Sequence, residues 1–161
     1  MSADTRLLMG EFSRSLDERY RMSLPAELAD PFVEAGPNCI LVKERPGCLS
    51  LWVESVWQAQ YSAAVELLQA KLRAGKLRDR GADVQRLGRM LSTRHRVIPL
   101  AGRGRLVLPE GFREFLGVEA GGMVLVVGAA VCLELWHEAS WREHLGRELP
   151  GFSSLFEELT R

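Results

Sequence analysis

The stretch Leu16-Asp17-Glu18-Arg19-Tyr20-Arg21-Met22-Ser23-Leu24-Pro25 decides how this chain is organised, because a second version of it follows 84 positions later. The second version reads Leu100-Ala101-Gly102-Arg103-Gly104-Arg105-Leu106-Val107-Leu108-Pro109. Both versions keep the first leucine, two arginines separated by one residue, and the final Leu-Pro pair. We refer to them below as the first and second motif.

The offset of 84 positions extends far beyond the two motifs. Residues 11–58 and 95–142 are identical at 13 of 48 positions without a gap, and both end in Cys-Leu-x-Leu-Trp-x-Glu-x-x-Trp. Similarity in one fixed register indicates an internal duplication of one structural unit. Two copies are too few for a stacked repeat array, so we expect a single body with two related halves.

The composition is that of a globular chain without net charge. Its 161 residues carry 21 basic and 21 acidic side chains, and this length is sufficient for one domain with its own core. The cysteines Cys39, Cys48 and Cys132 form no CxxC pair, which favours buried free thiols and a reducing cytoplasm. Residues 1–6 are polar and no apolar run is long enough to span a bilayer, so we expect neither export nor membrane insertion.

The charges are unevenly distributed along the chain. Residues 71–105 contain eleven Lys or Arg but only two acidic side chains, whereas residues 134–161 contain six Glu and three Arg. A basic segment can attract a polyanion such as nucleic acid. The same segment could equally be a solvated helical face followed by a linker.

Apolar residues at every second position predict strands on both sides of each motif. Residues 7–16 and 21–24 flank the first motif, and residues 94–100 and 105–108 flank the second. Each motif is therefore predicted to be the tip of a β-hairpin. The proline that ends each motif suits the first turn of a short helix.

Further along each half, the pattern predicts a second hairpin and then a helix. The hairpins are expected at 39–53 and 123–137, and helical periodicity follows at 54–73, 82–92 and 138–149. We therefore expect one domain, 1–161, composed of a first unit at 7–58, a helical connector at 59–94, a second unit at 95–149 and a C-terminal tail at 150–161.

Catalytic and metal-binding patterns are weak in this sequence. His137 and His144 are seven positions apart but lack a third ligand at a typical spacing, which favours surface histidines over a metal site. Gly102-x-Gly104 leads into a strand, whereas a phosphate-binding loop leads into a helix. The repeated tryptophans could stack on unpaired bases, but their place between strand and helix favours core packing. We expect no enzyme activity, metal, cofactor or small-molecule substrate.

The arginines of the two motifs are the strongest candidates for a binding site. Arg19 and Arg21 enclose one residue in the first motif, as Arg103 and Arg105 do in the second. A guanidinium group can bind a phosphate or the O6/N7 edge of guanine through two hydrogen bonds. Alternatively, Asp17 could pair with one of the nearby arginines and simply stabilise a turn. The duplication of the whole motif favours a binding role.

These residues resemble the MraZ family of bacterial transcriptional regulators, which are relatives of the AbrB-type swapped-hairpin DNA-binding proteins. The family pattern, Leu-Asp-x-Lys-Gly-Arg-x-x-x-Pro, occurs twice in one chain, and each occurrence is followed by a Leu-x-Leu/Ile-Trp strand and a second Trp. Here the resemblance covers nearly the whole sequence, and Val84-Gln85-Arg86-Leu87 also resembles the family's middle helix.

The resemblance implies a mainly β fold with helices (α+β), formed as a double-split β pseudobarrel from two tandem pseudo-repeats. It also implies a ring-shaped homo-oligomer, associated with the nucleoid in the cytoplasm, that binds double-stranded DNA. Such a ring is expected to act as a repressor at short repeated G-rich boxes near a division and cell-wall gene cluster. The alternative is a protein-binding or scaffold ring of the same fold, which the zero net charge favours.

The family's functional positions can be assigned to individual residues of this chain. Its Asp-x-x-x-Arg pattern falls on Asp17 and Arg21, and its basic third position falls on Arg19. The corresponding positions of the second motif are Arg103 and Arg105. The resemblance therefore implies that these four arginines contact DNA and that Asp17 supports the first loop.

Both motifs also depart from the family pattern. The aspartate is replaced by Ala101 in the second motif, where Gly102 and Gly104 are expected to support the loop through their backbone freedom. Tyr20 occupies the family's glycine position in the first motif. That loop must either avoid a positive φ or accept a bulky residue there at a cost of about 1 kcal/mol or more.

Overall fold

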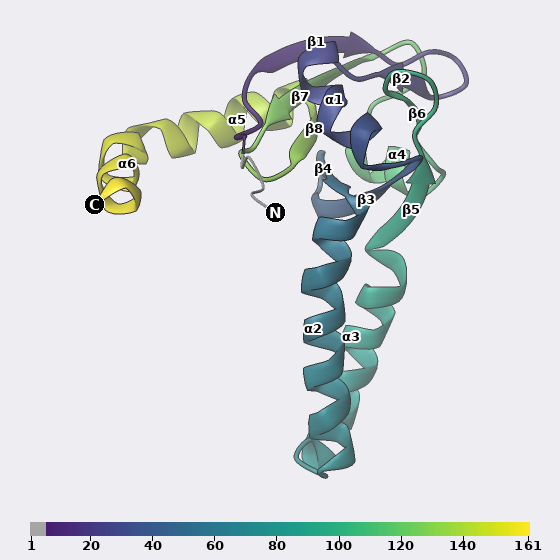
Figure 1. Cartoon of the computed structure of the whole chain (residues 1–161), viewed down its shortest axis with the longest axis vertical. Helices are drawn as coiled ribbons and strands as arrows, with labels where there is room; N and C mark the ends of the chain where they lie inside the picture. The colour runs from purple at the N-terminus through teal and green to yellow at the C-terminus, as the bar shows by residue number, and fades with distance from the viewer. Residues whose placement is uncertain (1–5) are drawn as a thin grey trace.

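The computed structural model describes residues 6–161 of the chain, in two matching series of elements (Figure 1). The first series is β1 (Glu11–Ser15), β2 (Arg21–Ser23), α1 (Ala26–Ala35), β3 (Asn38–Arg45), β4 (Cys48–Val53) and α2 (Glu54–Arg73). The second is β5 (His95–Pro99), β6 (Arg105–Val107), α4 (Phe112–Leu116), β7 (Met123–Gly128), β8 (Leu133–His137) and α5 (Glu138–Glu148). Each element recurs in the order that the duplication predicts.

The remaining elements lie between and after the two series. A short η1 (Arg78–Arg80) and α3 (Gly81–Thr93) connect the halves, and η2 (Leu149–Gly151) and α6 (Phe152–Thr160) end the chain. Residues 1–5 lie outside the described residues. They belong to the polar start of the chain, in which we expected no export signal. Within residues 6–161, no helix has the length and apolar character needed to cross a bilayer.

Six strands form one open antiparallel sheet in the order β1-β7-β8-β4-β3-β5. This order is symmetric, because each strand and its counterpart lie at equal distances from the central β8–β4 pair. The first strand of each half pairs with the other half: β1 pairs with β7, and β5 pairs with β3. Strands β2 and β6 leave the sheet and pair with each other as a separate two-stranded ribbon. The fold is therefore mixed α+β around an antiparallel sheet that does not close.

Each motif forms a tight turn, closed by backbone hydrogen bonds between Asp17 and Arg21 and between Ala101 and Arg105, but the flanking strands do not form the predicted hairpin. The strands flanking the first motif, β1 and β2, pair with β7 and β6 rather than with each other. Local alternation indicates a strand without naming its partner, which is decided by the apolar faces that meet in the core. In the ribbon, Met22 lies opposite Leu106 and both are buried. The second hairpins, β3–β4 and β7–β8, are confirmed.

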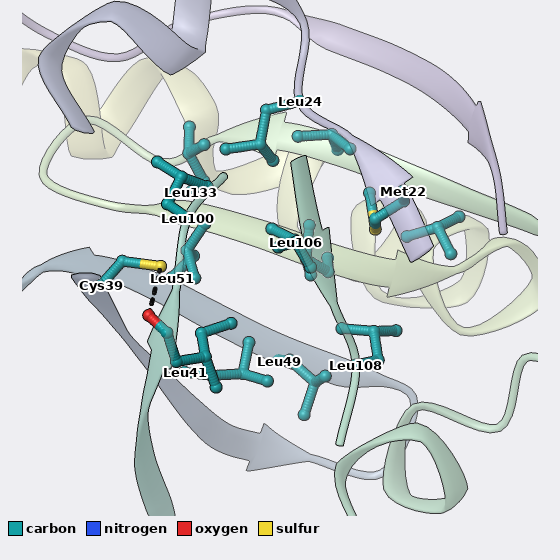
Figure 2. Close-up of a cluster of buried hydrophobic side chains, with 14 of the residues drawn as sticks. Met22, Leu24, Cys39, Leu41, Leu49, Leu51, Leu100, Leu106, Leu108 and Leu133 are labelled. Carbon is teal, nitrogen blue, oxygen red and sulfur yellow. Dashed lines mark hydrogen bonds between the residues drawn. The ribbon is translucent and has the colours of Figure 1, made fainter. Parts of the chain in front are cut away.

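The main core lies between the sheet and the β2–β6 ribbon, and both halves supply it. Figure 2 shows this layer, with Met22, Leu24, Leu41, Leu49 and Leu51 from the first half and Leu100, Leu106, Leu108 and Leu133 from the second. Cys39 lies beside them, and its thiol donates a long hydrogen bond to the carbonyl oxygen of Ile98, 3.8 Å away. Burial raises the pKa of Cys39 to about 12, so this thiol stays protonated.

A smaller apolar cluster on the other face of the sheet is centred on Trp136. Its side chain is 1% exposed, its ring centroid lies 5.2 Å from that of Trp141 in α5, and its Nε1 donates to a Glu134 carboxylate oxygen. Trp52, the counterpart in the first half, is only half-buried. There Trp57, the counterpart of Trp141, stacks on Tyr61, with 4.7 Å between the ring centroids.

The predicted connector helices are confirmed as α2 and α3, which extend away from the sheet in Figure 1. Every residue of these two helices is exposed or half-buried, including Leu67 at 61% and Met90 at 49% exposure. Helix α6 also leaves a stripe of apolar side chains in solvent. The described chain therefore has a well-packed sheet body, while helices α2, α3 and α6 are largely uncovered.

Replacing Trp136 with alanine should destabilise the fold by about 3–5 kcal/mol, because the change leaves a large cavity under α5. Chemical denaturation of the two proteins would measure the difference in free energy of unfolding. The matched variant Trp52→Ala, at the half-buried counterpart, should cost clearly less. Equal losses at the two positions would contradict the difference in packing between the two halves.

Candidate nucleic-acid interface

The β2–β6 ribbon places one arginine from each motif on the same exposed face. Arg21 lies opposite Val107, and Arg105 lies opposite Ser23, while the central pair points into the core. Because side chains alternate along a strand, all four outer residues share one face. The two strands are antiparallel, so the loops that carry Arg19 and Arg103 lie at opposite ends of the ribbon. The structure thus brings all four predicted arginines to one ribbon, and all four are exposed.

Asp17 organises the first loop through one carboxylate. Its Oδ1 accepts hydrogen bonds from the backbone amides of Arg19 and Arg21, at 2.8 and 2.9 Å. Its Oδ2 lies 2.8 Å from Nε of Arg21, which completes an exposed ion pair. These bonds, led by the one from the Arg21 amide, lower the pKa of Asp17 below its ordinary value. The carboxylate therefore holds both the loop backbone and the Arg21 side chain.

The second loop lacks this support. Ala101 occupies the aspartate's place, so the amide of Arg105 donates instead to the backbone carbonyl of Ala101, at 2.9 Å. Within residues 6–161, the Arg105 side chain makes no hydrogen bond or ion pair with another side chain, and its guanidinium lies beside Gly102. Arg105 is thus less constrained than Arg21.

Both loops require an unusual backbone conformation at equivalent positions. Gly104 has a φ of 112°, and Tyr20, 84 residues earlier, has a φ of 58°. Glycine adopts such angles freely, whereas a residue with a side chain incurs a cost of about 1–2 kcal/mol. Of the two possibilities that the sequence left open for Tyr20, the structure shows the strained one. Gly102 also has a positive φ, of 54°.

A hollow of about 530 Å³ lies between the ribbon and the end of β1. Arg14, Arg21 and Arg105 line it, together with the Asp17 carboxylate. Arg14 was missed by the sequence analysis, because its counterpart in the second half is Ile98 and the duplication therefore gives no signal. Three guanidinium groups against one carboxylate make this hollow suited to an anionic ligand.

Comparison with known proteins shows that the chain is similar to members of one family. Residues 98–158 match the family model for "MraZ protein", a group described as antitoxin-like. The "Transcriptional regulator MraZ" of Syntrophomonas wolfei is 27% identical over 153 residues, which cover 95% of this chain and 96% of the relative. The proteins of the same name from Acetivibrio thermocellus and Thioalkalivibrio sulfidiphilus are 25% and 29% identical. The alignment with the Acetivibrio protein covers 95% of this chain and 96% of that relative. The alignment with the Thioalkalivibrio protein covers 84% of this chain and 83% of that relative.

The family model covers the second motif, and the longer alignments extend over both motifs with their arginines. The resemblance read from the sequence is thereby confirmed. Through residues 98–158 and through these relatives, this chain is similar to the MraZ family.

Proposed function

We propose that this protein is a transcription regulator that binds double-stranded DNA in a sequence-specific manner. The observation that carries the proposal is the β2–β6 ribbon, whose exposed face presents Arg21 and Arg105 between two further arginine-bearing loops. The major groove of B-DNA admits a two-stranded ribbon, and arginine is the commonest reader of guanine there. The relatives' name, transcriptional regulator, supports the same conclusion.

The finer parts of this proposal derive from the family resemblance. We infer that the two halves act as pseudo-repeats of a double-split pseudobarrel, with units at 7–58 and 95–149, a connector at 59–94 and a tail at 150–161. The targets are short repeated G-rich boxes before a division and cell-wall gene cluster, and the effect is repression. The protein acts in the cytoplasm at the nucleoid, without catalysis or a cofactor.

Ring assembly is the second element of the proposal. Helices α2, α3 and α6 leave apolar side chains in solvent, including Leu67, Leu87, Met90 and Phe156. Contact between subunits would remove such surface from water. A ring would present several ribbons to successive boxes, so that weak single contacts combine into high overall affinity.

Selection from a pool of random DNA duplexes tests the proposal directly. Purified protein should enrich short direct repeats, and the enriched sequences would define the box. Absence of enrichment even at low salt would refute the DNA-binding proposal and would favour the alternative, a protein-binding ring.

Arg21→Ala should weaken binding to the enriched sequence, since a paired contact to guanine contributes about 1–3 kcal/mol of discrimination. A lost base contact relaxes preference at one box position, while a lost phosphate contact lowers affinity evenly and reduces the salt slope by about one. Arg105→Ala should have a smaller effect, because this side chain is less constrained. Arg147→Ala, on α5 and paired with Glu143 at 3.0 Å, provides the control.

Asp17→Ala should weaken DNA binding several-fold, because Arg21 loses the group that orients it. Ala101→Asp is the complementary change and should strengthen binding by giving Arg105 a similar partner. In the free protein, NMR should show that the pKa of the Asp17 carboxyl lies below the ordinary value for an aspartate. Its support of the loop is then complete above that value and is lost as the pH falls through the lowered pKa. A normal titration would refute the role assigned to this carboxylate.

The purified protein should have a mass of several subunits across micromolar concentrations by light scattering. Leu67→Lys on α2 should lower that mass without unfolding the protomer, because Leu67 is 61% exposed. The nearby change Gln69→Lys adds the same charge without removing apolar surface. A strictly monomeric parent protein would contradict ring assembly.

A further inference from the structure

Tyr20 and Arg113 form a contact between the two halves beside the first arginine-bearing loop. The guanidinium carbon of Arg113, in α4 of the second half, lies 4.0 Å from the centroid of the Tyr20 ring. The Arg113 side chain is only 26% exposed. A guanidinium at this distance over an aromatic ring makes a favourable cation–π contact. Neither residue belongs to the arginine pattern that both motifs share.

The equivalent contact in the other half is made by two small residues. Adding 84 to position 20 gives Gly104, and subtracting 84 from position 113 gives Ala29. A Cβ added to Gly104 would lie 2.8 Å from the Cβ of Ala29, so these two residues are also neighbours. In both halves, then, the loop lies against the first helix of the other half. One contact is bulky and cationic, and the other is a close approach that only glycine permits.

The backbone around Tyr20 explains why the bulky contact matters. With φ at 58°, Tyr20 donates its amide to the carbonyl of Asp17 at 3.0 Å, and its own carbonyl accepts from the amide of Leu108 at 2.9 Å. A tyrosine prefers negative φ. Rotation to that region would turn the adjoining peptide groups and disturb the amides of Arg19 and Arg21 that bond to Asp17. Packing of the half-buried ring against the core and under Arg113 opposes this rotation.

We propose that Arg113 is a positioning residue for the first DNA-contacting loop. By stacking on Tyr20, Arg113 retains the first loop at the strained positive φ on which the placement of Arg19 and Arg21 depends. In the second loop, Gly104 adopts a positive φ without such a contact. The proposal rests on the proposed DNA binding, since the loop's function is taken from there. It adds that the first loop's affinity depends on a helix of the other half.

Arg113→Ala should weaken binding of the enriched DNA about 2- to 30-fold, the range that one cation–π contact supports. The apparent affinity falls because a smaller fraction of the protein holds the competent loop. The salt slope should stay unchanged, whereas a direct phosphate contact by Arg113 would reduce it by about one. Arg142→Ala, which also removes one cation but on α5, should bind as the parent does.

The decisive variant combines Arg113→Ala with Tyr20→Gly. Glycine needs no partner at this φ, so the double variant should recover most of the lost affinity. Tyr20→Phe should behave as the parent, because the stacked ring remains. If Arg113→Ala binds as tightly as the parent, or if the double variant is no better than Arg113→Ala alone, the proposed role of Arg113 is wrong.

Hydrogen exchange provides a readout that does not require DNA. The Leu108 amide reports loop opening, since it donates to the Tyr20 carbonyl. Its exchange should accelerate in Arg113→Ala and slow again in the double variant. Failure of the parent to bind any DNA would refute the proposed function, while this exchange pattern would still support the contact. Unchanged exchange in Arg113→Ala would overturn the contact itself.

Discussion

Exchange of strands between the two halves is the constraint on which the rest of the structure depends. Strand β1 pairs with β7 of the other half, and β5 pairs in the same way with β3. Strands β2 and β6 pair with each other. Because the central pair of the ribbon is buried, the core cannot form from one half alone. The loop of each motif thus begins in the sheet and ends in the ribbon. Its ends are fixed by strands of the other half.

This exchange explains why the two loops can differ while the ribbon stays the same. The first loop relies on a carboxylate, Asp17, and on a stacked pair from different halves; the second relies on Gly102 and Gly104. A side chain held before binding loses less freedom in the complex than a free one. In the proposed DNA complex, we therefore expect the Arg21 side chain to be more preorganised for its contact, and the Arg105 side chain to be more adaptable.

The sequence predicted the parts of this fold that depend on local pattern or on the duplication. The helices at 54–73 and 82–92 and the later hairpins follow from periodicity and turn residues. The partner of β2 could not be predicted, because alternation around Met22 suits any strand with an apolar face. Comparison of the two halves highlighted the arginines but hid Arg14 and Arg113, whose counterparts are Ile98 and Ala29. Residues that serve one half only leave no repeated signal.

The zero net charge of the chain does not oppose DNA binding, because a polyanion responds to the local potential. Beside the ribbon, the one carboxylate of the hollow is already paired with Arg21, and the two remaining guanidinium groups lack such a partner within the described residues. The acidic excess lies in the segment of α5 and α6, which leaves the opposite side of the sheet from β2 and β6 in Figure 1. In the proposed complex, this separation of charge would favour contact of DNA with the ribbon over contact with the acidic side. We therefore expect the charges to favour one orientation on DNA and to limit non-specific affinity, so that discrimination between sequences would depend on the arginines of the ribbon and its loops.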